Sequence, residues 1–160
     1  MYSLHVVPHL KHSAALKTYD NAVMDCVESL LSGSFSDSKW LLASLSTKMG
    51  GLGLRSTEKH SPAAFLSSQI ACRELCKEVD PHYRTDQEHT HNDFTLALSD
   101  YNTKVKPDQQ IEENVDMCPH QQTLSHAIDC NTLETIREAS TNNVHYQAHI
   151  NHTTASGAGS

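Results

Sequence analysis

The sequence predicts a mainly α-helical protein, built from short helices in an irregular, loosely packed array with a glycine corner at residues 50–53. Apolar residues recur at three- and four-residue steps in several segments, which is the helical period. The hydrophobic fraction of the 160-residue chain is 38%, which is low for a globular domain. We therefore expect a lean core, with disordered termini or a disordered linker.

The first predicted helix covers residues 14–31, and Gly33 stands at its C-terminal end. Its apolar positions follow the helical period: Leu16, Tyr19, Val23, Cys26, Val27 and Leu30. A shorter helix is predicted over 36–45, capped by Ser36 or Asp37, and it would bury Trp40 together with Leu41 or Leu45.

A third helix is predicted to begin at Ser61-Pro62, because proline in the first helical position loses no helix hydrogen bond. Its apolar positions continue as far as Asp80-Pro81: Phe65, Leu66, Ile70, Leu75 and Val79. These elements define a first helical region over residues 1–80.

Residues 81–117 are polar and acidic, with a weak helical signal at 92–101, and we interpret them as a linker or loosely packed connection. The last region, 118–160, contains a predicted pair of short helices, 121–129 and 131–139, and then a polar tail. The second helix of the pair starts like a capping box, with Asn131 three residues before Glu134.

Charge and cysteine content exclude several classes. Residues 1–59 carry six Lys/Arg and five Asp/Glu, whereas 60–160 carry six and fourteen, so the chain lacks the basic stripe of an autonomous nucleic-acid binder. Five irregularly spaced cysteines argue against a disulfide framework. With no membrane-length apolar run and no signal-peptide core, we expect an intracellular protein that needs no membrane.

The most unusual stretch is "KMGGLGLRSTEKHSPAAFLSS", residues 48–68. A dinucleotide-binding loop needs a third glycine after Gly51 and Gly53, but Ser56 stands in its place. No Gly-Lys-Ser/Thr is present either, which excludes a P-loop. Gly50, Gly51 and Gly53 are therefore expected to form a tight structural corner.

Histidine is frequent, with twelve residues in the chain. His145, His149 and His152 would share one face of a helix, a spacing that could bind zinc, and Cys118 and His120 could add ligands. Cys72 and Cys76 lie one helical turn apart. None of these forms a recognised closed ligand set, so exposed histidines are the simpler interpretation, and we expect no cofactor.

Catalytic signatures are lacking: there is no nucleophile elbow, and the chain contains no Asp-Asp pair that could hold Mg²⁺ against phosphates. We therefore expect no enzymatic activity from this chain.

Residues 40–68 resemble a segment of the reverse-transcriptase-like proteins of non-LTR retrotransposons, just downstream of the catalytic core. In that family a tryptophan helix precedes a Leu-Pro-x-x-x-Gly-Gly-Leu-Gly-Leu-Arg-Ser corner, which is followed by His-x-x-Ala-Ala-x-Leu-x-Ser. The matching residues are Trp40, Ala43, Ser44, Leu45, Gly50, Gly51, Leu52, Gly53, Leu54, Arg55, Ser56, His60, Ala63, Ala64, Phe65, Leu66 and Ser68. Ser46 replaces the family's usual proline.

The flanking residues are also similar to the family. Tyr19-Asp20 stands in the place of a Phe-Asp pair, and residues 121–140 resemble a downstream pair of helices. The resemblance implies a non-catalytic fragment of an RNA-directed DNA polymerase, from the thumb- or connection-like helices after the palm. The family's Tyr/Phe-x-Asp-Asp turn lies upstream of this segment and is absent from the chain, so no catalytic residue carries over.

The resemblance implies that the partner is the remainder of a polymerase or another helical protein. Lys39, Lys48 and Arg55 could contact a phosphate backbone, although Arg55 could equally cap the preceding helix or pair with Glu58. Two alternative hypotheses are a repurposed helical protein-interaction module and a histidine-based metal-binding protein.

Overall fold

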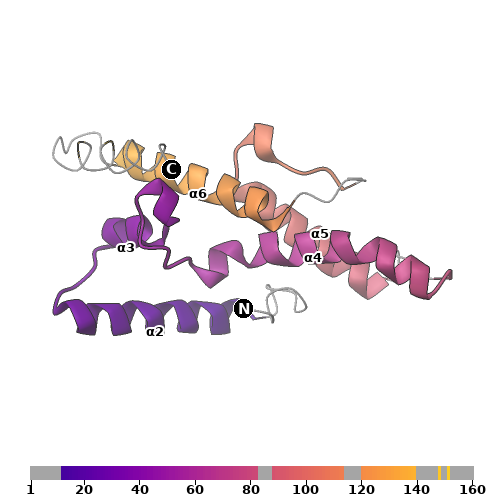
Figure 1. The fold of residues 1–160 in the computed structure, drawn as a ribbon, viewed down its shortest axis with the longest axis horizontal. Helices are drawn as coiled ribbons and strands as arrows, with labels where there is room; N and C mark the ends of the chain where they lie inside the picture. Colours follow the sequence, from indigo (N-terminus) through magenta and orange to yellow (C-terminus); the bar gives the residue numbers. More distant parts are fainter. Residues whose placement is uncertain (1–11, 83–87, 114–119, 140–147, 149–150, 152–160) are drawn as a thin grey trace. The chain divides into compact units, whose positions relative to one another are not determined.

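A computed structural model describes residues 12–82, 88–113 and 120–139, together with residues 148 and 151 (Figure 1). Over these residues the chain forms α-helices, short 3₁₀ turns and irregular connections, and no strand. The prediction of a mainly α-helical fold is confirmed. Among the described helices, none combines the length and apolarity needed to cross a bilayer.

The chain divides into two compact units. Unit 1 comprises Met1–Lys17 and Thr57–Ile128, and unit 2 comprises Thr18–Ser56 and Asp129–Ser160. The divisions fall inside helix α2 (Ser13–Leu31) and helix α6 (Gln121–Ala139).

Unit 1 is built on helix α4 (Thr57–Val79), which packs against helix α5 (Glu88–Thr103) (Figure 1). The 3₁₀ turn η3 (Pro107–Gln109) and the first part of α6 complete the unit. Its apolar side chains form one cluster with less than a tenth of their surface exposed, listed from α4 to α6: Ala63, Phe65, Leu66, Ile70, Phe94, Ala97, Leu98, Tyr101, Val105, Leu124, Ala127 and Ile128.

Helix α4 begins at Thr57, one turn before the predicted start at Ser61-Pro62, so that prediction is wrong. Pro62 lies inside the helix and has no N–H to donate to the carbonyl of Glu58. Two side chains supply donors instead, since Ser61 Oγ lies 3.1 Å and Lys104 Nζ 3.4 Å from that oxygen. A tertiary contact from Lys104 thus helps to satisfy the carbonyl that Pro62 leaves without its usual helical donor.

Helix α5 and the loop after it, residues 88–113, pack against the rest of unit 1, so this part of 81–117 is not the loose connection that the sequence predicts. Phe94, Ala97, Leu98 and Tyr101 line one face of this helix and are buried. The loop beyond the helix is fixed by the side chain of Asn102, whose Nδ2 donates to the Ile111 carbonyl and whose Oδ1 accepts from the Ile111 N–H, each at 2.9 Å. Ile111 packs against the apolar cluster.

Helix α6 corrects a second prediction, because residues 121–139 form one helix and not a pair. Asn131 lies inside it and does not cap a new helix; its carbonyl accepts a hydrogen bond from Thr135 Oγ1 at 3.0 Å. Leu133 and Ile136 continue the buried face beyond that point.

Unit 2 contains most of α2, helix α3 (Asp37–Ser44), the 3₁₀ turn η2 (Thr47–Met49) and the end of α6. Helix α3 is capped by Ser36, as predicted, with the Lys39 N–H donating to Ser36 Oγ at 3.4 Å. A small cluster forms the core: Leu45, Leu133 and Ile136, with Leu41, Leu42 and Met49 packed on it. Trp40 is half-buried and meets Phe35 edge-on, with ring centroids 5.9 Å apart.

Helix α2 ends at Leu31, as predicted, and the residue after it, Ser32, is left-handed with φ of 50°. The N–H of Gly33 donates to the Glu28 carbonyl at 3.2 Å, which is the six-to-one hydrogen bond of a Schellman motif. Serine thus occupies the position where glycine is usual.

Candidate functional site

The glycine corner lies in unit 2 between α3 and α4, and it confirms the predicted turn. Gly50 has φ of 81° and ends η2 by donating its N–H to the Thr47 carbonyl at 3.1 Å. Gly53 has φ of 74°. Both angles lie in the left-handed region, which residues other than glycine rarely adopt. The turn therefore needs glycine at these two positions.

Gly51 is required for a different reason, which is close packing. A Cβ atom at this position would lie 2.1 Å from the Leu45 carbonyl oxygen and 2.7 Å from that of Leu42. Both neighbours are backbone atoms at the end of α3 and cannot rotate away. The corner therefore packs directly on the last turn of that helix.

The backbone N–H groups of the corner are used inside the chain. Gly51 donates to the Ser46 carbonyl at 3.1 Å, and Gly53 donates to the Leu45 carbonyl at 2.9 Å. Leu52 and Leu54 both donate to the Ala43 carbonyl, at 3.0 and 3.3 Å. A phosphate-binding loop needs such N–H groups directed at the ligand, so these bonds argue against an anion site here.

Arg55 follows the corner and forms an ion pair within unit 2. Its Nη2 lies 3.1 Å from Oδ2 of Asp129 on α6. The Asp129 side chain is 2% exposed and the Arg55 side chain 35% exposed. The carboxylate that holds Arg55 is thus Asp129, and not the Glu58 suggested by sequence proximity.

Ser56, the next residue, holds a second carboxylate. Its Oγ donates a 2.6 Å hydrogen bond to Oδ2 of Asp20 on α2, and Asp20 is 8% exposed. We call these two contacts, Arg55–Asp129 and Ser56–Asp20, the corner clasp. Two consecutive residues thereby join the corner to α2 and α6, and they give two buried carboxylates hydrogen-bonding partners.

The sequence indicated Asp20 through the resemblance but did not single out Asp129. A signal was present, because Asp129 lies between Ile128 and Leu133 on the apolar face of α6. A carboxylate on such a face needs a cation or donor, and Arg55 meets this need.

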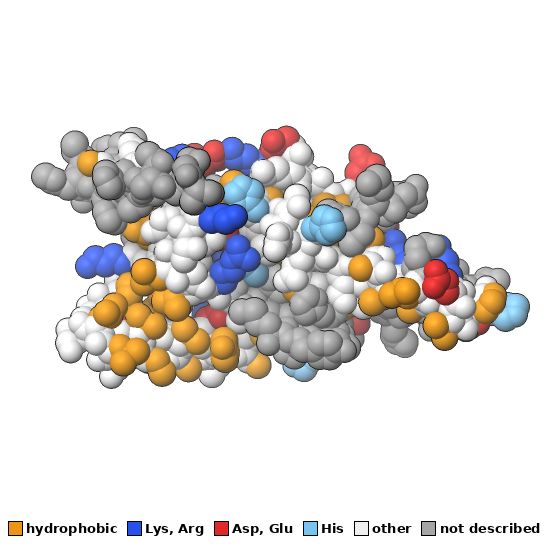
Figure 2. All heavy atoms as spheres, in the orientation of Figure 1, with side chains coloured by type: hydrophobic (Ala, Val, Ile, Leu, Met, Phe, Trp, Pro, Cys, Tyr) orange, Lys and Arg blue, Asp and Glu red, His pale blue; other side chains and the backbone are white. Residues whose placement is uncertain are grey.

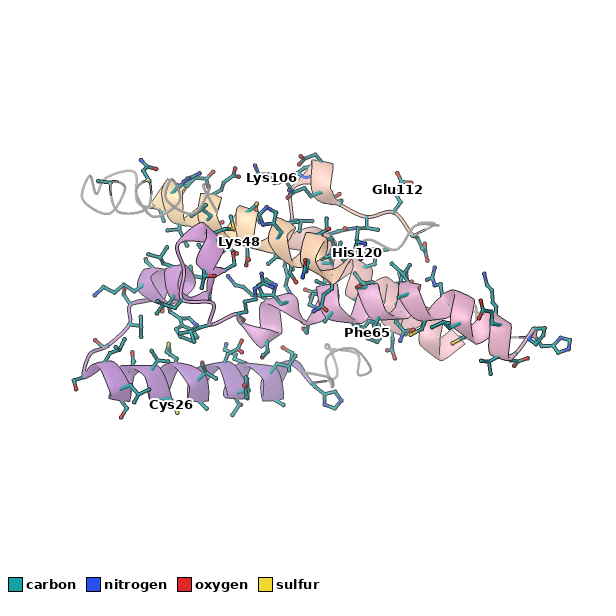
Figure 3. The ribbon with its side chains drawn as sticks, in the orientation of Figure 1. Cys26, Lys48, Phe65, Lys106, Glu112 and His120 are labelled. Atoms are coloured by element: carbon teal, nitrogen blue, oxygen red, sulfur yellow. The ribbon has the colours of Figure 1, made fainter. Side chains whose placement is uncertain are left out.

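The other predicted nucleic-acid contacts, Lys39 and Lys48, are exposed residues of unit 2. Lys39 lies in the first turn of α3, and Lys48, labelled in Figure 3, lies in η2 next to the corner. Arg55 differs from both lysines because its guanidinium is held by the clasp.

The predicted metal ligands His145, His149 and His152 lie outside the described residues, as does Cys118. His120 is exposed, one residue before α6 begins. Within the part of the chain that the structure describes, no three His, Cys, Asp or Glu side chains come together as a metal site.

Comparisons with known proteins found no match to this chain, whether among protein-family models, curated proteins or solved structures.

Proposed function

We propose that this chain is a non-catalytic helical segment of a retrotransposon reverse-transcriptase-like protein, and that its glycine corner is a structural joint between helices. The corner clasp is the observation that carries this proposal. The Arg-Ser step that ends the glycine motif, together with the Asp of the Tyr-Asp pair, supplies three of the four clasp residues. A structural use of these side chains gives the resemblance a physical reason without any catalytic role.

The test is to sequence the transcript outward from the coding region. The proposal expects neighbouring sequence that encodes a reverse-transcriptase palm with its Tyr/Phe-x-Asp-Asp turn, in the same frame or in a decayed one. Neighbouring sequence that encodes an unrelated protein would contradict the proposed origin.

A repurposed protein-interaction module is the second candidate, and exposed apolar residues on α2 favour it. Tyr19 is 57% exposed, Leu30 83% and Leu31 63%. Figure 2 shows hydrophobic side chains gathered over this helix. Exposed apolar residues of this kind are typical of a helix that docks on another protein. If the chain is a segment of a polymerase, the remainder of that polymerase would be the docking partner.

Sedimentation and urea unfolding of the isolated chain separate the two candidates. A defined species that unfolds cooperatively favours an independent module. Concentration-dependent aggregation that ends when the upstream polymerase region is co-expressed favours a segment of a larger protein.

A nucleic-acid role predicts RNA affinity that falls steeply with salt. It also predicts weaker binding for Lys39→Gln and Lys48→Gln. We expect no salt-dependent retention, because the guanidinium of Arg55 is already paired with Asp129 and the two exposed lysines do not form a basic stripe.

A further inference from the structure

We propose that Cys72 and Cys76 on α4 form half of a thiolate site for a soft divalent cation such as Zn²⁺, and that a second copy of this chain supplies the other half. The cation would be bound by four thiolates, two from each copy. The proposal is independent of the proposed function, since it uses the opposite end of α4 from the corner.

The two thiols are free, accessible and one helical turn apart. Cys72 is exposed and Cys76 is half-buried, and neither is in a disulfide. The helix is regular beyond them, with the Asp80 N–H donating to the Cys76 carbonyl at 2.9 Å. Side chains four residues apart on a helix have Cβ atoms about 5–6 Å apart. Two sulfur atoms at that spacing can converge to the roughly 3.8 Å separation of a tetrahedral zinc site with Zn–S bonds of about 2.3 Å.

One side of α4 near the thiols contacts α5, whereas Cys72 is exposed and Cys76 is half-buried. The guanidinium carbon of Arg73 lies 4.5 Å from the centroid of the Phe94 ring on α5. Arg73 thus marks the side on which α5 packs. Cys72 and Cys76 lie to one side of that contact.

A second copy of the chain is the occupant we infer, because it can supply the two thiolates that this helix turn lacks. A closed structural zinc site takes four ligands, and this helix turn supplies two. The described residues bring no third His, Cys, Asp or Glu to it. Two copies related by a two-fold axis would present the same two thiols to one cation, so the set of four is completed without another protein.

Apolar residues on the same face support this pairing. Leu75 is 60% exposed and Val79 87% exposed, and both share the stretch of helix that carries the thiols. In a symmetric pair each would be covered by the other copy, which adds apolar burial to the metal–thiolate bonds. Each cysteine releases its proton as the sulfur binds, so affinity should fall as the pH is lowered.

The test uses the full chain under a non-thiol reductant, with Cd²⁺ as a spectroscopic probe and Zn²⁺ as a competitor. We expect the ultraviolet cadmium–thiolate charge-transfer band to saturate at about half an equivalent of Cd²⁺ per chain. The molecular mass measured by sedimentation equilibrium should double at the same point. Excess Zn²⁺ should remove the band while the doubled mass remains.

Variants assign the ligands. Cys72→Ser and Cys76→Ser should each lose the mass doubling and most of the band, whereas Cys26→Ser, an exposed single thiol on α2, should retain both. Leu75→Asp should keep the thiols but prevent the mass doubling. Circular dichroism checks that each variant keeps its helicity, which serine at these two accessible positions should preserve.

The proposal is overturned by a band that survives both Cys72→Ser and Cys76→Ser, since other thiols would then be the ligands. Saturation at one cation per chain with an unchanged mass would also overturn it, because the site would then lie within one copy. The absence of any cadmium–thiolate band would also overturn the proposal.

Discussion

In unit 1, apolar side chains from three helices pack into one cluster, whereas unit 2 joins its helices through a smaller cluster and the polar contacts of the glycine corner. Unit 1 buries Phe94 and Tyr101 among aliphatic residues. The cluster of unit 2 has three buried apolar residues, and the corner clasp holds two carboxylates.

The two units should therefore tolerate substitution differently. An apolar cluster accepts many combinations of residues if their total volume is kept. A corner that packs backbone against backbone accepts only glycine at Gly51, and each clasp residue needs a partner of matching chemistry. The corner accordingly stands out as a motif, while the helices of unit 1 carry only a periodic pattern.

Gly51→Ala should destabilise unit 2 more than any other substitution considered. The added Cβ meets backbone atoms at 2.1 to 2.7 Å, and we expect a loss of about 3 kcal/mol or more in the free energy of unfolding. Urea unfolding measures the loss, and amide hydrogen exchange should show unit 2 opening before unit 1. Gly33→Ala is the control, because its Cβ would lie 3.8 Å from the nearest atom. Equal stability of the two variants would contradict the close packing at Gly51.

Raising the pH tests unit 1 through Tyr101. Burial raises the pKa of this phenol from 10.0 to about 12. Below pH 10 the phenol is protonated in both states and its contribution is fully present. Between pH 10 and pH 12 only the unfolded state releases the proton, so stability falls by about 1.4 kcal/mol per pH unit, or about 2–3 kcal/mol in all.

Tyr101→Phe isolates this effect from the titration of other groups. The variant should lack this part of the alkaline loss when urea midpoints are compared from pH 9 to pH 12. Parallel curves for the two proteins would show that the phenol is not buried as described.

Asp129→Asn tests the clasp of unit 2. The change removes the charge that faces Arg55, and the buried amide replaces an ion pair with a weaker contact. We expect the free energy of unfolding to fall by about 1–3 kcal/mol. This loss is smaller than for a fully buried ion pair because Arg55 is partly solvated. The control is Glu112→Gln on the exposed loop after α5, labelled in Figure 3, which should change stability by less than about 0.5 kcal/mol.

The smallest expected effect is a gain. Ser32→Gly relieves a serine held at φ of 50° and should raise the unfolding free energy by about 0.5–1 kcal/mol. Thermal unfolding followed by circular dichroism measures it. Ser34→Gly, at a residue without a positive φ, should give no gain. A loss at Ser32 would mean that the serine side chain contributes more than its backbone angle costs.

The fold class, the first two helices and the corner could be predicted because their signals are local. The helical periodicity predicts α2, the capping serine predicts the start of α3, and the glycines predict the turn. Gly51 was expected as part of the turn, but its packing role depends on the Leu45 carbonyl, which sequence spacing does not reveal.

The remaining errors have tertiary causes. The sequence of α5 gives only a weak helical signal, because most of its residues are polar and its apolar face has only four residues. Packing of that face against α4 stabilises the helix, and the local sequence does not reveal this packing. The Glu58 carbonyl near the start of α4 accepts from Lys104, which is far along the chain, and Leu133 and Ile136 are buried in the part of α6 beyond Asn131. Neither contact can be seen in the local sequence. The partner of Arg55 comes from a residue far along the chain, which periodicity cannot identify.

The clasp also sets the order in which the protein can fold during synthesis. Arg55 and Ser56 emerge from the ribosome soon after Asp20, but Asp129 emerges only after the whole 57–128 stretch of unit 1. The α2 half of unit 2 can form early, while its α6 half closes a long loop at the end. A translation product that stops before α6 would contain the glycine corner and Arg55 but would lack Asp129, the partner of Arg55.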